Sequence, residues 1–344
     1  MINISRLTEE ELAKFIEENG EKKFHAKQIY KWIHKIGIRS YDEMTDISKS
    51  LRNFLKENTY MTDLKIIKCQ ESKKDGTKKF LIELEDGNII ESVFMVYKHG
   101  NTACVSTQVG CRMGCKFCAS TKAGFVRHLY ADEIEGQIWA MQKYTNQRIS
   151  NIVYMGIGEP LDNFDNTLKS IEIINSANGL NIGARHISIS TCGLVPRIYE
   201  LADRKTQCTL SISLHATTDE TRKKIMPIAN KYSVKELIDA CKYYIKTTGR
   251  RISFEYALIA DVNDTKEEAL KLARLLEGML AHVNLIPVNE IRDGQYVKSK
   301  EKNIATFMDT VNSCGIITTV RRELGADIEA ACGQLRRDHI DNKK

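Results

Sequence analysis

Apolar residues recur at helical spacing through the first 60 residues. Thr8 and Glu11 form a capping-box pattern in front of the first apolar run, and Gly20 supplies its stop. The helices predicted from this period run from Thr8 to Gly20, from Ala26 to about Lys35, and from Ile47 to Glu57. The pattern therefore predicts a small N-terminal helical module at residues 1–60.

The period becomes strand-like from about Leu64 to Val96. Two pairs, Asp75-Gly76 and Asp86-Gly87, supply the positive φ angles that two-residue hairpin turns require. The region at 61–96 is therefore predicted to be a three-stranded β-meander. Four lysines flank its first turn and predict a projecting basic tip: Lys73, Lys74, Lys78 and Lys79. Such a tip suits either a soluble edge hairpin or a contact with nucleic-acid phosphates.

From Thr102 onward, predicted strands alternate with predicted helices. The predicted strands are Thr102–Val109, Asn151–Met155, His186–Thr191, Thr209–Leu214, Ile252–Leu258, Val283–Ile286 and Ile316–Val320. The predicted helices are Ala131–Lys143, Asn166–Ser176, Pro196–Ala202, Val234–Tyr244, Lys266–Glu277 and Lys302–Asn312. This alternation predicts an α/β fold with a parallel sheet, and six units indicate a partial (β/α)6 barrel at residues 97–328. Residues 329–344 form the predicted C-terminal loop and tail.

Three cysteines lie within eight residues, directly after the first predicted barrel strand. They are Cys111, Cys115 and Cys118, with glycines beside them that let the loop fold round a bound group. A structural zinc ion takes four protein ligands, and His128 is too far along the chain for a finger-like spacing. An iron-sulfur cubane held by three cysteines keeps one iron open for a substrate. On spacing alone, a structural zinc or redox thiol site is the alternative.

Polar residues collect at the ends of the other predicted strands, where ligands gather in such folds. The second strand ends with Gly158 and Glu159, a glycine that permits close backbone approach and a carboxylate for an ammonium group. The remaining candidates follow the third, fourth and sixth strands: Ser190, Ser213, Leu214, His215 and Asn289. Such groups at one barrel mouth suit ribose and carboxylate recognition. Taken singly, the Gly-Glu-Pro segment fits an ordinary turn and His215 a structural histidine.

Composition limits the class of protein. A chain of 344 residues with 42% hydrophobic content can bury a large core, in one main domain and a smaller one. It has no charged-then-apolar leader and no apolar run long enough to span a bilayer, so we expect a cytoplasmic protein with no membrane partner. Its ten cysteines then fit reduced thiols and ligands rather than a disulfide framework. The net charge of +6 is compatible with a polyanionic partner.

The C-x3-C-x2-C spacing, with an aromatic before the last cysteine, resembles the radical S-adenosylmethionine (SAM) superfamily. Further segments resemble its RlmN family: Cys104–Cys111, Met155–Leu161, Ser213–Ala216, Met226–Ile228, and Arg321–Gly325 through Cys332–Leu335. The resemblance spans nearly the whole chain, including the helical module. It implies a methyltransferase that acts on adenosine C2 in 23S rRNA and in tRNA.

The resemblance also implies cofactors and roles. Cys111, Cys115 and Cys118 would hold one [4Fe-4S] cluster. The strand-end residues would contact SAM: Gly158, Glu159, Ser190, Ser213, Leu214, His215 and Asn289. Two SAM molecules would be used per turnover. Cys332 would carry a methyl group, Glu91 would take the C2 proton, and Cys104 would displace the Cys332 sulfur, forming a disulfide. An electron donor and a thiol reductant would be needed, and we expect a monomer.

Several alternatives accompany this assignment. A Cfr-type enzyme methylates C8 instead, but such proteins tend to have Gly-Glu-Ala at the SAM motif, a cysteine at the position of Val109, and a different segment at 321–324. A non-enzymatic, metal-stapled RNA-binding protein is also compatible with the lysines and the net charge. Glu91 fits an exposed strand glutamate, and Cys104 and Cys332 fit buried, inert thiols.

Overall fold

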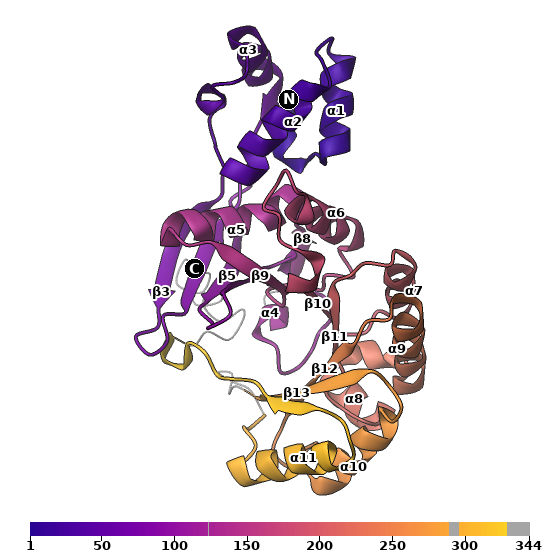
Figure 1. The fold of residues 1–344 in the computed structure, drawn as a ribbon. Helices are drawn as coiled ribbons and strands as arrows, with labels where there is room; N and C mark the ends of the chain where they lie inside the picture. The colour runs from indigo at the N-terminus through magenta and orange to yellow at the C-terminus, as the bar shows by residue number, and fades with distance from the viewer. Residues whose placement is uncertain (123, 289–295, 329–344) are drawn as a thin grey trace.

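A computed structural model describes residues 1–122, 124–288 and 296–328. Within these residues one ten-stranded sheet has the order β14-β13-β12-β11-β10-β9-β6-β5-β4-β3 (Figure 1). Its strands are β3 (Lys65–Glu71), β4 (Lys78–Glu83), β5 (Ile89–Met95), β6 (Asn101–Cys104), β9 (Ile149–Tyr154), β10 (Ile187–Thr191), β11 (Thr209–Ser213), β12 (Ile252–Leu258), β13 (Ala281–Pro287) and β14 (Thr318–Val320). Neighbours from β6 to β14 are parallel, and β3 to β6 are antiparallel. The meander thus extends the barrel sheet.

Helices pack against the outer face of the parallel strands (Figure 1). They are α5 (Ala131–Thr145), α6 (Phe164–Asn175), α7 (Val195–Asp203), α9 (Val234–Thr248), α10 (Lys266–Leu275) and α11 (Glu301–Ser313). Sequence signals set their ends: α9 begins at a capping box between Ser233 and Glu236 and ends at Gly249, which has a φ of 66°. The predicted helices of the barrel, and its predicted parallel strands after the first, are confirmed to within a few residues.

Alternation along the strands separates the hydrophobic core from a polar inner face. Ile212 and Phe254 point into the core with the helices and are fully buried. Their neighbours Ser213 and Glu255 lie side by side in the register and face the other way, toward a cavity. The concave side of the sheet therefore carries the groups available for chemistry.

The predicted strand Thr102–Val109 is wrong, because two strands replace it. After β6 ends at Cys104, the chain continues beside the loop that follows β9, where the Thr107 N–H donates to the Ile157 carbonyl at 2.9 Å. It then forms β7 (Gln108–Gly110), which pairs with β8 (Phe125–His128) in a separate two-stranded sheet. The short elements β8, α4 (Ala119–Lys122) and α8 (Asp219–Ile225) carry no clear apolar period and were not predicted.

The two-residue hairpin turns are also wrong, because the connecting loops span residues 72–77 and 84–88. Gly76 and Gly87 do have positive φ angles, 74° and 78°. Each aspartate instead accepts a hydrogen bond within its own loop, from the Thr77 N–H to Asp75 Oδ1 at 2.9 Å and from the Asn88 N–H to Asp86 Oδ1 at 3.1 Å. The Asp-Gly pairs therefore close longer, side-chain-capped loops.

The predicted basic tip is only half correct. The Lys79 side chain is fully buried, and its Nζ lies 3.3 Å from Glu91 Oε2 on the neighbouring strand. Lys78 forms an ion pair with Glu71. Only Lys73 and Lys74 are exposed at the tip, so the expected group of four solvent-facing ammonium groups is wrong.

The N-terminal module has a hydrophobic core of its own. It contains β1 (Ile2–Asn3), α1 (Glu9–Glu18), α2 (Phe24–Lys31), a π-helical turn (Trp32–Ile36), α3 (Lys49–Asn58) and β2 (Thr59–Tyr60). The capping box of Thr8 and Glu11 is confirmed. At the start of α5, buried Asp132 accepts hydrogen bonds from Asn3 Nδ2 at 2.9 Å and Arg6 Nε at 2.7 Å. These contacts fix the module on the barrel, as Figure 1 shows. None of the helices in the described ranges has the length and apolar composition of a membrane span.

Candidate active site

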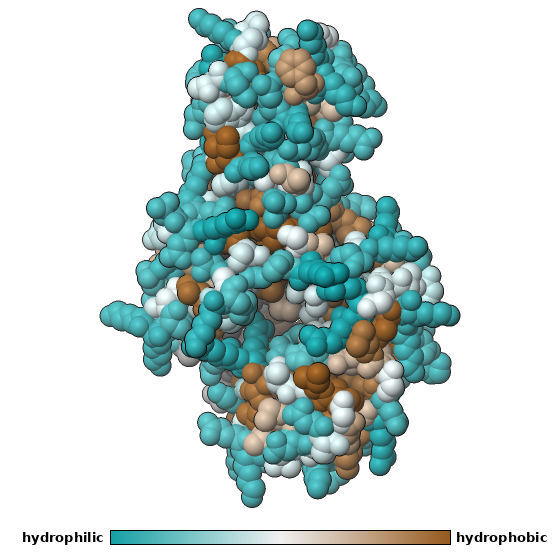
Figure 2. Space-filling view, in the orientation of Figure 1, coloured by the Kyte–Doolittle hydropathy of each residue, from teal (hydrophilic) through white to brown (hydrophobic). Residues whose placement is uncertain are grey.

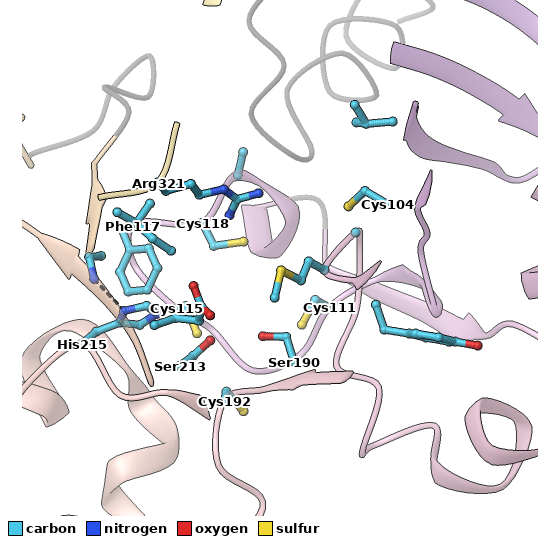
Figure 3. A pocket seen from close by; sticks show the side chains of 18 of the residues that line it. Cys104, Cys111, Cys115, Phe117, Cys118, Ser190, Cys192, Ser213, His215 and Arg321 are labelled. Carbon is cyan, nitrogen blue, oxygen red and sulfur yellow. Dashed lines mark hydrogen bonds between the residues drawn. The ribbon is translucent and has the colours of Figure 1, made fainter. Parts of the chain in front are cut away.

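A cavity of about 380 Å³ opens on the concave side of the sheet. Hydrophilic side chains cover most of the face drawn in Figure 2, and the surface is hollowed near its middle. The cavity wall includes most of the predicted site residues: Cys104, Cys111, Cys115, Cys118, Gly158, Glu159, Ser190, Ser213 and His215. Figure 3 labels the four cysteines, the two serines and His215 among them. The volume lies in the range of small-molecule sites. Residues far apart in the sequence thus meet where the parallel strands end.

The cysteine loop follows β7 and is held by close backbone contacts. Gly110 has a φ of 78°, and a Cβ there would lie 1.7 Å from the Gly124 carbonyl oxygen, so only glycine fits. The Lys116 N–H donates to the Ile225 carbonyl at 2.9 Å, which ties the loop to α8. Figure 3 shows Cys111, Cys115 and Cys118 around the same part of the cavity.

The electrostatics of these thiols fit a metal centre. Burial raises the pKa of Cys111 to about 12. Burial also raises the pKa of Cys115, and the negative charges of the neighbouring Cys118 and Cys111 thiolates raise it further. Ionised thiols here therefore need the positive charge that a metal supplies. No three His, Cys, Asp or Glu side chains in the described part of the chain are placed to hold a metal ion. A three-cysteine loop round a larger group, an iron-sulfur cluster, fits this donor set better than zinc.

Glu159 joins the ends of two strands. Its buried carboxylate accepts hydrogen bonds from the Cys192 N–H at 2.7 Å and the Leu161 N–H at 3.0 Å. Burial raises the pKa of Glu159, and the hydrogen bond from Cys192 opposes that rise. The carboxylate thus lies at the cavity wall, but the hydrogen bonds it accepts come from backbone N–H groups of the protein. An ammonium group of a ligand would have to use the remaining lone pairs.

Gly158 is closely packed in this loop. Its φ is 112°, and a Cβ would lie 2.7 Å from Gln108 Cβ. Gly158→Ala should lower SAM affinity at least about tenfold, because strain of about 1–3 kcal/mol must be relieved by moving the loop. Equilibrium binding of SAM checks this. The control is Gly249→Ala, which has a φ of 66° but open space around it, and should bind SAM normally. Unchanged affinity in Gly158→Ala would contradict the placement.

His215 is a neutral hydrogen-bond donor at the cavity wall. Its Nδ1 accepts the Ala257 N–H at 2.9 Å, so the ring proton is on Nε2. Burial, with a further effect of Arg222, lowers the pKa of His215 to about 3. The ring also meets Phe117 edge-on, with centroids 4.9 Å apart. His215 therefore stays uncharged at any physiological pH.

One other predicted SAM contact, Leu214, stands apart from the cavity wall. Leu214 is fully buried in the main core and does not line the cavity; its carbonyl accepts a hydrogen bond from Arg222 Nε at 3.1 Å. Asn289 lies outside the described residues. Ser190 and Ser213, in contrast, both line the cavity.

Cys104 and Glu91 lie on the same face of neighbouring strands. Cys104 pairs with Val93 across the β5–β6 ladder, and Glu91 is two positions from Val93. Burial raises the pKa of the Cys104 thiol to about 11, partly opposed by Arg321. Glu91 is 1% exposed, so its interpretation as an exposed strand residue is wrong. Glu91 does not itself line the cavity, and Cys332 lies outside the described residues.

Two residues at the site were not predicted from the sequence. Arg222 is fully buried and donates to the carbonyls of Cys192 and Ser213, at 2.6 and 3.2 Å, which fixes two strand ends. Its charged neighbours in α8 are typical of a surface helix, so nothing distinguished it. Glu255 lines the cavity and accepts from Asn284 Nδ2 at 2.7 Å. A polar residue alternating with apolar ones inside a predicted buried strand was the available signal.

Family models match two parts of the chain, and relatives match its whole length. A model for the "Ribosomal RNA large subunit methyltransferase N-terminal domain" matches residues 2–61, and one for the "Radical SAM superfamily" matches residues 105–273. A "Probable dual-specificity RNA methyltransferase RlmN" of Clostridium perfringens (strain SM101 / Type A) is 59% identical over 343 residues, covering 100% of this chain and 99% of the relative. The chain belongs to the RlmN family. This membership confirms the resemblance of the sequence motifs.

A second relative and a solved structure are also similar to this chain over nearly its whole length. The protein of the same description from Clostridium novyi (strain NT) is 57% identical over 342 residues, 99% of this chain and 100% of the relative. The crystal structure of "a radical SAM methyltransferase from Sphaerobacter thermophilus" superposes with a TM-score of 0.92 at 39% identity, covering 97% of this chain and 99% of that chain. The predicted α/β fold is confirmed. As a radical SAM family, RlmN implies a [4Fe-4S] cluster and SAM.

Proposed function

We propose that this chain methylates C2 of adenosine in 23S rRNA and in tRNA, using a methylcysteine on Cys332. The observation that carries the proposal is the cavity, which gathers three clustered cysteines, the separate thiol Cys104 and the strand-end polar groups. RlmN relatives described as dual-specificity RNA methyltransferases support the two RNA substrates. A non-enzymatic RNA-binding protein would not need a second kind of thiol facing such a cavity.

The residues divide into binding and reacting groups. Cys111, Cys115 and Cys118 would hold the cluster, which when bound and reduced supplies the electron that splits SAM into methionine and a 5'-deoxyadenosyl radical. The backbone at Gly158 and Glu159, together with Ser190, Ser213, Leu214, His215 and Asn289, would orient SAM. The Nε2–H group of His215 would donate a hydrogen bond to a ligand oxygen.

Cys332 and Cys104 would carry the covalent steps. The Cys332 thiolate takes a methyl group from a first SAM by polar displacement, releasing S-adenosylhomocysteine. Hydrogen removal from this methyl by the radical of a second SAM lets the carbon add to the electron-poor C2. The adduct is a radical, so it would give up one electron, which the oxidised cluster would take back, and Glu91 would accept the C2 proton. Cys104 then attacks the Cys332 sulfur; the electrons of the broken C–S bond pass to the methylene carbon, which gains a proton and becomes the new methyl.

The proposal requires further partners. The Cys104–Cys332 disulfide must be reduced by an external thiol, and an electron donor must serve the cluster. The thiol reductant and the electron donor are both required, and the other cysteines have to stay reduced. These requirements support a cytoplasmic location. Exposed lysines at and near α2 support RNA contact by the module at residues 1–60: Lys22, Lys23, Lys27 and Lys35. A stacked adenine cannot reach a buried site, so the target is flipped out or unpaired.

The test is nucleoside mass spectrometry. Anaerobic protein, reductant and SAM are incubated with a 23S rRNA transcript or a tRNA transcript, and the digested nucleosides are compared with 2-methyladenosine and 8-methyladenosine. The proposal predicts 2-methyladenosine in both RNAs. Formation of 8-methyladenosine would instead establish the Cfr-type reaction, and SAM cleavage without any methylated nucleoside would contradict the RNA substrates.

A further inference from the structure

The chain after β14 crosses the open side of the barrel. Strands β14 and β3 are the two edges of the ten-stranded sheet formed by the described residues. Beyond β14, Arg321–Leu324 line the cavity, and Ala326–Ile328 form a 3-10 turn. In Figure 1 this yellow end of the chain runs across to the loop that joins β3 and β4. The segment therefore bridges the two edges of the sheet.

Three hydrogen bonds hold the segment to that loop. The Gly325 N–H donates to Asp75 Oδ2 at 2.8 Å. Asp327 accepts from Ser72 Oγ at 2.6 Å and from the Lys73 N–H at 3.0 Å. We call this set of contacts the latch. The residues it joins are some 250 positions apart in the chain, so the contacts are tertiary and not part of a local turn.

Both aspartates are suited to hold the latch closed. Burial opposes ionisation of Asp75, but hydrogen bonds from the Gly325 and Thr77 backbone hold its pKa at about 2. Asp75 Oδ1 already accepts the Thr77 N–H, so each oxygen has its own donor. An asparagine has only one carbonyl oxygen and could serve only one of these two donors.

We propose that Asp75 and Asp327 are positioning residues that together hold the Gly325–Asp327 turn beside the cavity, and so shorten the length of chain between Cys332 and a fixed point there. The inference rests on the proposed function of Cys332. Chain length supplies the reason. Cys332 is five residues from Asp327, a reach of at most about 17 Å, but eleven residues from Arg321, the last residue that the sheet itself holds, a reach of about 38 Å.

The expected size of the effect follows from the longer tether. The effective concentration of a tethered group falls roughly as the −3/2 power of tether length, so opening the latch should lower the Cys332 encounter rate roughly threefold. It should not change the cluster loop or the SAM contacts, which lie on other elements. Opening the latch is therefore expected to slow the methylation of Cys332 and to leave iron content and SAM affinity unchanged.

The experiment compares wild-type protein, the double variant Asp75→Asn/Asp327→Ala, which removes both sides of the latch, and the control Asp86→Asn, all as full chains with the cluster reconstituted. Asp86 is the matched control because it caps the other Asp-Gly loop in the same way but contacts Arg127 and Asn88, not the latch. Hydrogen exchange of the peptide containing Gly325 and mass spectrometry of the Cys332 peptide after addition of SAM are measured on each.

We expect Gly325 to exchange at least about tenfold faster in the double variant Asp75→Asn/Asp327→Ala, and Cys332 methylation to slow roughly threefold, with Asp86→Asn behaving as wild type in both. Equal exchange in the double variant and wild type would overturn the latch, and faster exchange with an unchanged methylation rate would overturn its positioning role. A wild-type protein that never methylates Cys332 would overturn the proposed function instead, while the exchange comparison would still decide whether the latch orders the turn.

Discussion

Cys104→Ala is expected to stop the reaction with the RNA covalently joined to the protein. Cys104 is the thiol proposed to break the bond between Cys332 and the new carbon, and it lines the cavity without belonging to the clustered cysteines. The variant should therefore keep its iron and its SAM cleavage but release at least about a hundredfold less methylated RNA. A denaturing gel of the reaction with labelled tRNA transcript should show a slowly migrating RNA–protein species, absent from the wild type.

The control for this variant is Cys69→Ala. Cys69 is a partly buried thiol of β3 and has no role in the proposal, so its removal should leave product release unchanged and produce no adduct. If Cys104→Ala releases methylated RNA at the wild-type rate, Cys104 is not the resolving thiol, and its position on the cavity wall has a purely structural cause.

Cys332→Ala should abolish RNA methylation. The methyl group has no other proposed carrier, so product should fall at least about a thousandfold, to the background of the assay. The protein should take no methyl group from SAM at this position and should form no adduct, even when combined with Cys104→Ala. Nucleoside mass spectrometry of the RNA, with peptide mass spectrometry of the protein, measures both.

A matched control is Cys314→Ala, which removes an exposed thiol just after α11. This variant should methylate RNA as the wild type does. Substantial 2-methyladenosine from Cys332→Ala would refute the carrier role and with it the covalent sequence, while leaving the assignment to the RlmN family intact.

Much of the fold could be predicted because local signals and packing agree in it. The capping box at Thr8 and Glu11 and the glycine after α9 mark helix ends that the structure has. Alternating strands and helices force a parallel sheet, whose strand ends bring Ser190 and Ser213 to one cavity. These conclusions need only periodicity and chain connectivity.

The remaining features depend on tertiary contacts that periodicity does not encode. The break between β6 and β7 occurs where backbone groups bond to the loop after β9 instead of to a strand. The sequence pattern predicts Lys79 at the surface, but it is buried because it forms an ion pair with Glu91 on the neighbouring strand. Arg222 is buried by carbonyls from two strand ends, and the latch joins residues at opposite ends of the sheet. In each case the partner lies on another element of the fold, which the local sequence pattern does not reveal.

The central claim is that three thiols hold a cluster with one iron open to SAM. Its most direct test is anaerobic isolation of the protein, with metal and sulfide analysis and assay of 5'-deoxyadenosine after addition of reductant and SAM. We expect a brown protein with about four irons that forms 5'-deoxyadenosine, and loss of both in Cys115→Ala. A colourless protein that binds zinc at Cys111, Cys115 and Cys118 and leaves SAM intact would contradict the account.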